Sequence, residues 1–283
     1  MFPTPIEKTS SRTQTLYKIS LPFALVIWLL PLLAVMLTAT RSLTDINTGN
    51  YWGWPTEFSL VQNFQQVFDT TPMGQYLLNS LIITVPTVLG TLAISTLAGA
   101  ALALYRFKMN MLVFAMFIAG NFIPFQILMI PVRDLMVSIG MYDTQLSLIT
   151  FHIAFQSGFC TLFMRNFIKA LPFELVEAAR VAGLSEFEIF RRVIVPLVRP
   201  ALAALGVLVF TFIWNDYFWA LVLIQTDTLQ PVTVGVNSLR GQWTVSWHLI
   251  SAGSMLAALP PVVMFFLMQR HFIAGLTLGA TKG

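Results

Sequence analysis

The sequence predicts an all-α membrane protein with six transmembrane helices, and two observations support this prediction: the composition and the spacing of the charges. Of the 283 residues, 57% are hydrophobic and only 10% are charged, and the mean hydropathy is +0.76. A water-soluble globular protein carries about 25% charged residues. This chain therefore cannot cover a compact surface in water, and we take the lipid bilayer as its solvent.

The charged residues are separated by long uncharged intervals, each able to hold the roughly 20 apolar residues that cross the hydrocarbon layer. One interval, between Arg199 and Asp227, is interrupted only by Asp216. We predict spans at residues 20–39, 77–104, 111–131, 145–164, 203–224 and 250–268.

The distribution of Lys and Arg predicts the orientation. With six spans both termini lie on one side, and 13 of the 16 Lys and Arg residues fall on that side. Positive charge collects in cytoplasmic loops, so we expect both termini in the cytoplasm. The predicted segments are a cytoplasmic N-terminal segment (1–19), the first helix (20–39), an outer loop (40–76), a transmembrane domain (77–270) with one long inner loop (165–200), and a cytoplasmic tail (271–283).

The outer loop contains a cluster of aromatic residues, Tyr51, Trp52 and Trp54. Trp and Tyr favour the boundary between membrane and water. The cluster is therefore either an interfacial belt or a contact surface for a partner outside the cell.

The composition also excludes other classes of protein and site. The sequence pI of about 9.4 arises without a dense basic tract, which argues against nucleic-acid binding. The single cysteine, Cys160, excludes an intramolecular disulfide and a multi-cysteine metal site, and we expect it to be a small packed side chain. His248 and His271 flank the sixth span without partners at metal-ligand spacing, so we expect interfacial positions for both and predict no metal site.

The inner loop begins with a pattern typical of a short helix over residues 172–182. Pro172 suits the first helical position, and Glu174 and Glu177 follow in the turns where the helix dipole favours anions. Gly183 provides a left-handed stop. Small side chains at Ala178, Ala179 and Ala182 leave room for another surface to approach closely.

A second short helix follows in the same loop. Ser185 and Glu188, three positions apart, form a capping box that starts a helix, and Pro196 is expected to disrupt it.

The fifth span contains the polar residues that we consider first for a solute path. Asp216 is a carboxylate inside a span, which indicates a functional role by default, although pairing with a partner subunit is an equal alternative. Asn215, Phe218 and Trp219 offer an amide beside aromatic rings, a surface that suits sugars. An interfacial aromatic belt explains the same residues equally well.

The third span contains a weaker candidate for the solute path. Gln126 lies between Pro124 and Pro131, and prolines in a transmembrane helix free backbone carbonyls that a solute can bind. Ordinary kinked packing is the simpler explanation of the same pattern.

The inner loop resembles the EAA loop found in membrane subunits of binding-protein-dependent ABC importers. Glu177-Ala178-Ala179 is followed by Gly183 four residues later and by Pro196 thirteen beyond that glycine. Residues 163–167, 214–217 and 275–283 also agree with this family, and the last stretch is similar to the end of the six-helix maltose-type subunit. The chain departs from the family pattern at Ala182, where Asp is common.

This resemblance implies a type I ABC importer permease fold in the bacterial inner membrane and a chain that is not itself an enzyme. The EAA residues would couple it to separate ATPase subunits, which bind the ATP and Mg²⁺, so the chain itself needs no cofactor. The implied partners are a second permease subunit, most simply a heterodimer, two ABC ATPases, an extracytoplasmic solute-binding protein and membrane lipid. The sequence itself lacks the Gly-x-x-x-x-Gly-Lys-Ser/Thr loop that would cradle ATP.

The same resemblance implies that the solute is a carbohydrate, and a small oligosaccharide fits best. A permease for a non-sugar solute is the first alternative. A secondary transporter is the second, but such proteins contain internal repeats and buried carboxylates along a pathway, whereas this chain has a single Asp216 and no matching halves. A membrane enzyme is disfavoured because no cluster of His, Asp and Glu is predicted at a membrane face.

Overall fold

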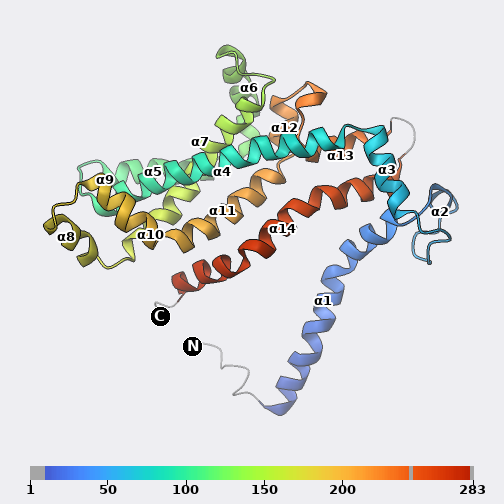
Figure 1. Cartoon of the computed structure of the whole chain (residues 1–283), viewed down its shortest axis with the longest axis horizontal. Helices are drawn as coiled ribbons and strands as arrows, with labels where there is room; N and C mark the ends of the chain where they lie inside the picture. Colours follow the sequence, from blue (N-terminus) through green and yellow to red (C-terminus); the bar gives the residue numbers. More distant parts are fainter. Residues whose placement is uncertain (1–9, 242–244, 281–283) are drawn as a thin grey trace. The chain divides into compact units, whose positions relative to one another are not determined.

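The structure, a computed structural model, describes residues 10–241 and 245–280, with side chains described up to residue 269. Figure 1 shows the order of the helices along the chain. In the described residues there is no β-strand, and extended pairing is limited to one bridge between Arg240 and Val245. The chain divides into two compact units, residues 1–71 with 239–256 and residues 72–238 with 257–283.

The first unit contains α1 (Ser11–Ala39), α2 (Leu43–Asn47) and α3 (Leu60–Thr70). The second contains α4 (Met73–Leu104), α5 (Asn110–Ala119), η2 (Gly120–Phe122), η3 (Phe125–Leu128), α6 (Met129–Ser138), α7 (Gln145–Lys169), α8 (Glu174–Val181), α9 (Glu186–Ile189), the π-helical turn η4 (Phe190–Ile194), α10 (Val195–Leu197), α11 (Arg199–Trp214), α12 (Phe218–Leu223), η5 (Asp227–Leu229) and α13 (Val232–Ser238). The last helix, α14 (Trp247–Ala280), begins in the first unit and ends in the second.

Four of these helices are long and apolar enough to cross a membrane: α1, α4, α7 and the part of α14 over Trp247–Gln269. Two further candidates are bent pairs of helices, Asn110–Phe122 with Phe125–Ser138 and Glu186–Leu197 with Arg199–Trp214. Counting each pair as one span gives up to six in the described chain. Each candidate overlaps one predicted hydrophobic segment, although the second pair ends at Trp214, within the predicted span 203–224.

The predicted third span, residues 111–131, is not one straight helix. The chain bends by 93° between Phe122 and Phe125. Pro124 explains the bend, because a proline disfavours helical angles in the residue before it, and Ile123 is extended with φ −79° and ψ 121°.

The helix ends also differ from the predicted bounds. α1 begins at Ser11, well before residue 20, with the Ser10 hydroxyl accepting a hydrogen bond from the amide of Thr13. α14 continues to Ala280, through most of the predicted tail. Polar residues can extend a helix as it leaves the hydrocarbon, so a hydropathy pattern gives the apolar length and not the helix length. The ends of the predicted terminal segments, residues 1–9 and 281–283, lie outside the described residues.

The predicted outer loop is held in a defined conformation by hydrogen bonds within the first unit. The buried carboxylate of Asp45 accepts hydrogen bonds from the side chain of Asn50 and from the amide and hydroxyl of Thr56. Arg41, also buried, donates to the carbonyl of Gly53. These contacts fix a loop from which Trp52 and Trp54 project, 82% and 89% exposed.

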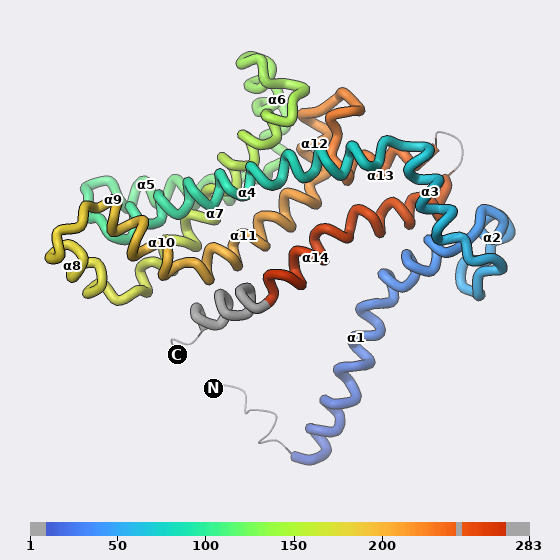
Figure 2. Tube along the Cα trace, viewed as in Figure 1, coloured from blue at the N-terminus to red at the C-terminus, as the bar shows by residue number. Residues whose placement is uncertain are grey.

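In the second unit, α4 and α7 form the most extensive helix pair, and α11 packs on both (Figure 2). Gly99 of α4 permits this approach. A β-carbon at Gly99 would lie 2.9 Å from the backbone nitrogen of Arg165 and 2.9 Å from the β-carbon of Met164 on α7. Small residues allow membrane helices to pack closely in this way.

A hydrogen-bonded tie joins the loop before α7 to the segment after α12 in the second unit. The carboxylate of Asp143 accepts from the amides of Gln225 and Thr226, at 2.8 and 2.9 Å, and from the Thr226 hydroxyl at 2.6 Å. Asp143 itself has φ +59°. A left-handed residue therefore turns its carboxylate onto a neighbouring segment.

The smaller expectations have different outcomes. Cys160 is buried, as predicted for a packed side chain. His248 is also buried, at 2% exposure, and its position at the membrane interface stays a prediction. The side chain of His271 lies outside the described residues.

Candidate functional site

The predicted fifth span is broken in the middle, at Asn215–Tyr217. α11 ends at Trp214 and α12 begins at Phe218, so the continuous helix expected over residues 203–224 is wrong. Asn and Asp side chains compete with the helix for backbone hydrogen bonds. Here the amide of Asn215 donates to the carbonyl of Thr211 at 2.8 Å.

Asp216 accepts hydrogen bonds from backbone amides that this break leaves without helical partners. Its carboxylate accepts hydrogen bonds from the amides of Trp219 and Ala220, at 3.3 and 3.1 Å, in the first turn of α12. The first amides of a helix have no partners within the helix. The carboxylate of the predicted span therefore has a local structural role, as a cap on the second half of a broken helix.

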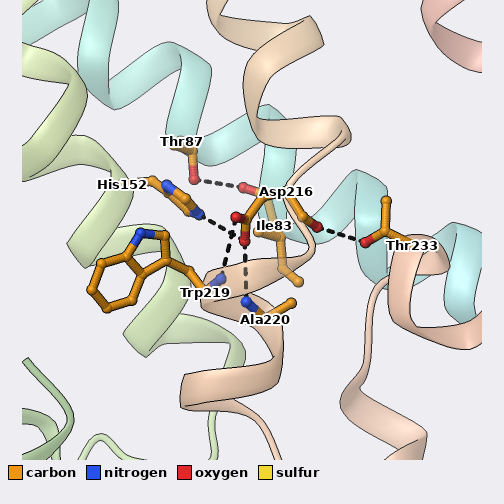
Figure 3. A network of polar contacts seen from close by, with 7 residues as sticks. All are labelled: Ile83, Thr87, His152, Asp216, Trp219, Ala220 and Thr233. Carbon is orange, nitrogen blue, oxygen red and sulfur yellow. Dashed lines mark hydrogen bonds and ion pairs between the residues drawn. The ribbon is translucent and has the colours of Figure 1, made fainter. Parts of the chain in front are cut away.

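The same carboxylate is joined to α7 through His152 (Figure 3). Nε2 of His152 lies 3.3 Å from Oδ2 of Asp216, and the two side chains are 1% and 12% exposed. The hydroxyl of Thr233 donates to the carbonyl of Asp216 at 2.6 Å. Residues from α7, the helix break and α13 thus meet at one carboxyl-bearing residue.

A cavity of about 430 Å³ opens beside this network in the second unit. It is lined by Phe125, His152, Phe155, Thr211, Phe212, Asn215, Asp216, Tyr217, Phe218 and Trp219. Six of these ten residues carry aromatic rings other than imidazole. The cavity is thus largely apolar, with a few polar groups gathered at the helix break, as is common in sites for small solutes.

The predicted solute-path residues meet at this cavity with one exception. Asn215, Asp216, Phe218 and Trp219 all line it, whereas Gln126 does not, although its neighbour Phe125 does. Gln126 is exposed.

The two aromatic residues of the predicted face have different environments. Trp219 is only 3% exposed and packs against Phe151 of α7 with ring centroids 3.9 Å apart. Phe218 is half-buried and meets Phe125 edge to face at 5.4 Å. Phe218 therefore offers the more accessible ring, whereas the buried ring of Trp219 packs between the cavity lining and α7.

His152 is the residue that the sequence analysis missed. It lies in the fourth predicted span, and an ionisable residue inside a span is itself a signal of function. Its partner Asp216 is 64 positions away, so no local pattern indicated the pair.

The predicted cytoplasmic loop, residues 165–200, contains the second predicted group of functional residues. α8 begins at Glu174, two residues later than the predicted start, and places Glu174 and Glu177 in its first turn. Val176 is buried in the hydrophobic core of the second unit, whereas Glu177 and Ala178 are exposed and Ala179 is half-buried. The acidic and small side chains thus lie mainly on the outer face of the loop.

The turn after α8 has the predicted geometry. Gly183 has φ +83°, the left-handed conformation expected of a helix stop. Ser185 and Glu188 form the predicted capping box, with the Ser185 hydroxyl accepting from the Glu188 amide and the Glu188 carboxylate accepting from the Ser185 amide.

Pro196 does not end the second loop helix where predicted. A π-helical turn over Phe190–Ile194 precedes it, and the helix continues through Pro196 to Leu197 before bending by 73°. A proline lacks the amide for a regular helical bond. The wider π turn accommodates the proline, and the bend falls instead at the junction with Arg199 and Pro200.

A polar cluster joins this loop to the end of α4. The guanidinium of Arg180 donates to both carboxylate oxygens of Glu186, at 2.7 and 3.2 Å, and the hydroxyl of Tyr105 donates to the same carboxylate. Burial, together with the bond to Glu186, raises the pKa of Tyr105. The bond to Glu186 likewise raises the pKa of Arg180. The cluster therefore stabilises Arg180 and Glu186 as an ion pair.

Within the described part of the chain, no group of three or more His, Cys, Asp and Glu side chains is placed to hold a metal ion. The two candidate regions are a polar helix break beside an apolar cavity and the acidic helix α8.

Comparison with known proteins gives three consistent results. Residues 92–278 match the family described as binding-protein-dependent transport system inner membrane component. An osmoprotective compounds uptake permease protein of Synechocystis sp. is 33% identical over 97% of this chain and 95% of its own length. An arabinooligosaccharides transport system permease protein of Halalkalibacterium halodurans is 32% identical over 98% of this chain and 99% of its own length.

The fold agrees with a solved structure. A bacterial ABC transporter involved in the import of the acidic polysaccharide alginate superposes with a TM-score of 0.80, over 95% of this chain and 100% of the matched chain, at 21% identity.

Proposed function

The chain belongs to the family of inner membrane components of binding-protein-dependent transport systems, and from this premise we propose that it is the permease subunit of an ATP-driven importer for a small oligosaccharide. The observation that supports a sugar is the cavity at the break between α11 and α12. It combines an exposed amide, Asn215, with the accessible ring of Phe218. Sugar hydroxyls bond to amides, and the C–H faces of sugar rings pack on aromatic rings.

The relatives support the same class of solute. The Halalkalibacterium halodurans protein is named for arabinooligosaccharides, and the structural neighbour imports a polysaccharide. A non-sugar solute is the alternative, because the relative from Synechocystis sp. is named for osmoprotective compounds without further definition.

The proposed function requires partner subunits, because this chain would supply only part of the membrane path. A second permease subunit completes the path, two ATPase subunits bind ATP and Mg²⁺, and an extracytoplasmic binding protein delivers the solute. The chain spans the bacterial inner membrane several times with both termini in the cytoplasm. Glu177 and the exposed small residues beside it form the surface that docks on an ATPase subunit.

The coupling role is tested with Glu177→Lys. A cation placed on a surface that fits an anion loses a charge-assisted contact, worth about 1.5–3 kcal/mol, so the ATPase should co-purify poorly and solute should no longer stimulate hydrolysis. Lys108→Glu, a charge reversal at another exposed position of the predicted cytoplasmic side, is the control and should behave as wild type. Normal co-purification and normal stimulation in Glu177→Lys would exclude the docking role.

The solute path is tested with Asn215→Leu. An unpaired sugar hydroxyl in a dry cavity costs about 1–3 kcal/mol, so uptake should fall while assembly and basal ATP hydrolysis persist. Cysteines at positions 215 and 218, in a Cys160→Ala background, should react with a water-soluble thiol reagent in at least one nucleotide state. If both stay unlabelled in every state while cysteines on the opposite face of α11 react, the path lies elsewhere.

A further inference from the structure

The charge of the cavity wall is its most specific feature. Within the described part of the chain, the residues that line the cavity include no Lys or Arg. The carboxylate of Asp216 is the acidic group in the wall. Its observed partners are the backbone amides of Trp219 and Ala220 and the imidazole of His152. The wall therefore offers a solute a carboxylate and other polar groups, without the guanidinium of Arg or the ammonium of Lys.

Asp216 cannot readily turn away from this position. Its carboxylate is bonded to two amides of α12, and its own carbonyl accepts a hydrogen bond from Thr233. His152, which is almost fully buried, fixes the carboxylate from the α7 side (Figure 3). The negative charge is thus held at one place beside the cavity.

Resting on the carbohydrate function proposed above, we propose that this cavity selects uncharged sugars, with Asp216 as the residue that rejects acidic ones and His152 as the residue that positions it. A solute carboxylate entering the cavity meets a fixed carboxylate and no Lys or Arg among the described lining residues, in surroundings that screen charge less than water does. Such repulsion discriminates between partners as effectively as attraction does. An uncharged sugar meets the same wall without this cost.

The experiment compares uncharged and acidic sugars of equal length in the complete transporter. Both permease subunits, the ATPases and the binding protein are reconstituted in liposomes, and the probes are lactose, melibiose and maltose, each with the aldonic acid made by oxidising its reducing end. Affinity of the binding protein for each probe is measured separately by calorimetry. Uptake is then compared at saturating binding protein for each pair of probes that the binding protein captures.

We expect wild type to favour the uncharged probe by at least about tenfold in kcat/KM, which corresponds to about 1.4 kcal/mol. In Asp216→Asn the single side-chain oxygen can still accept from one of the two α12 amides, which bond to different oxygens of the carboxylate, and the preference should fall toward unity. Asp69→Asn removes an exposed carboxylate of α3 and is the control, with the preference unchanged. Asn215→Lys, which adds a cation at an exposed lining position, should raise uptake of the acidic probe.

The positioning role of His152 has its own readout. Glutamine can still donate to Asp216 and phenylalanine cannot, so His152→Gln should keep the preference for uncharged sugar and His152→Phe should lose it. If His152→Phe inserts normally and keeps the full preference, His152 does not position the carboxylate.

The outcomes separate this proposal from the one on which it rests. If wild type takes up both members of a pair equally well, or if Asp216→Asn assembles and keeps the wild-type preference, charge selection by this wall is wrong and the carbohydrate function stands. If wild type transports none of the uncharged sugars that the binding protein captures, the carbohydrate function itself fails.

Discussion

Gly183 shows how one backbone angle shapes the predicted cytoplasmic loop. Its φ is +83°, and no described atom lies within 4 Å of the place where a β-carbon would stand. A substitution there therefore meets no clash, and its cost is backbone strain of about 1–2 kcal/mol for a residue that resists the left-handed conformation. Gly183→Val should lower transport and solute-stimulated ATP hydrolysis at nearly normal membrane abundance.

The matched control at this position is Gly183→Asn, because asparagine adopts left-handed angles several times more often than most residues. It should keep most of the transport activity. Equal activity in the valine and asparagine variants would mean that the angle of the turn does not matter for coupling.

Asp143 gives the molecule an acid-sensitive contact outside the predicted spans. The hydrogen bond from the Thr226 hydroxyl, with those from the Thr226 and Gln225 amides, holds the pKa of Asp143 below its usual value of 3.8. A lowered pKa stabilises the folded contact above the unfolded value, and this contribution is lost as the pH falls through the lower folded value.

Hydrogen exchange at the amides of Gln225 and Thr226 measures this effect in the purified protein. After correction for intrinsic exchange, protection should be constant above about pH 5 and should decline below pH 3.8. Asp143→Asn keeps the left-handed angle but lacks the charge, so its protection should be weaker at neutral pH and should not change in this window. A decline of the same size in that variant would assign the effect to another group.

Local patterns predicted the residues whose partners are close in the chain. Ser185 and Glu188 cap a helix three positions apart, and Gly183 ends the helix directly before it. His152 and Asp216 pair across 64 positions, and Trp219 is buried by Phe151 of another helix. Such pairings depend on how helices pack, which residue spacing in one chain does not encode.

At the scale of helices, the sequence located each apolar segment but not the breaks within two of them. Hydropathy averages over a window and is blind to a few residues that leave the helix, so Asp216 was expected inside a continuous span. The opposite error occurred at Pro196, where a π-helical turn lets the helix continue. Both errors have the same cause, a local change in backbone hydrogen bonding. At Asp216 a side chain bonds to backbone amides, and before Pro196 a wider turn replaces the regular helical bonds.

We expect the cluster of Arg180, Glu186 and Tyr105 to matter for coupling, because it links the predicted cytoplasmic loop to the end of α4. Exposed ion pairs contribute little to stability, so Glu186→Gln should leave abundance unchanged. Uptake per ATP hydrolysed should fall by roughly two- to fivefold. The measurement is solute uptake and phosphate release in the same liposomes.

Exchanging the charges, with Arg180→Glu and Glu186→Arg in one chain, keeps an ion pair at this position and should recover part of the lost coupling. Tyr105→Phe removes one donor alone and should have a smaller effect than Glu186→Gln. If Glu186→Gln takes up as much solute per ATP hydrolysed as wild type, the cluster has no role in coupling. Motion of the loop would then reach α4 through another contact.

At the scale of the whole molecule, the predicted orientation has a direct test. In a Cys160→Ala background, a cysteine at Asp69 should react with a membrane-impermeant thiol reagent added to intact cells. A cysteine at Lys108 should react only after the membrane is permeabilised, and both native positions are exposed. The reverse pattern would place the termini outside and would contradict the assignment of residues 165–200 to the cytoplasm.

The fold class was predictable because it follows from composition, and the family because its motif lies in one contiguous loop. The cavity was predictable only in part. Asn215 and Phe218 belong to one short stretch and were identified together, whereas Phe125 and Phe155 reach the same cavity from other helices.

Gly99 has a consequence for a saturation library of this chain. At position 183 a substitution is tolerated when the new residue can adopt left-handed backbone angles, as asparagine can. At position 99 every residue other than glycine has a β-carbon, and that atom would lie 2.9 Å from the backbone of α7. All substitutions at position 99 therefore meet the same clash. Sequencing survivors of selection for uptake should therefore recover glycine alone at position 99, with even alanine depleted, unless α4 and α7 move apart.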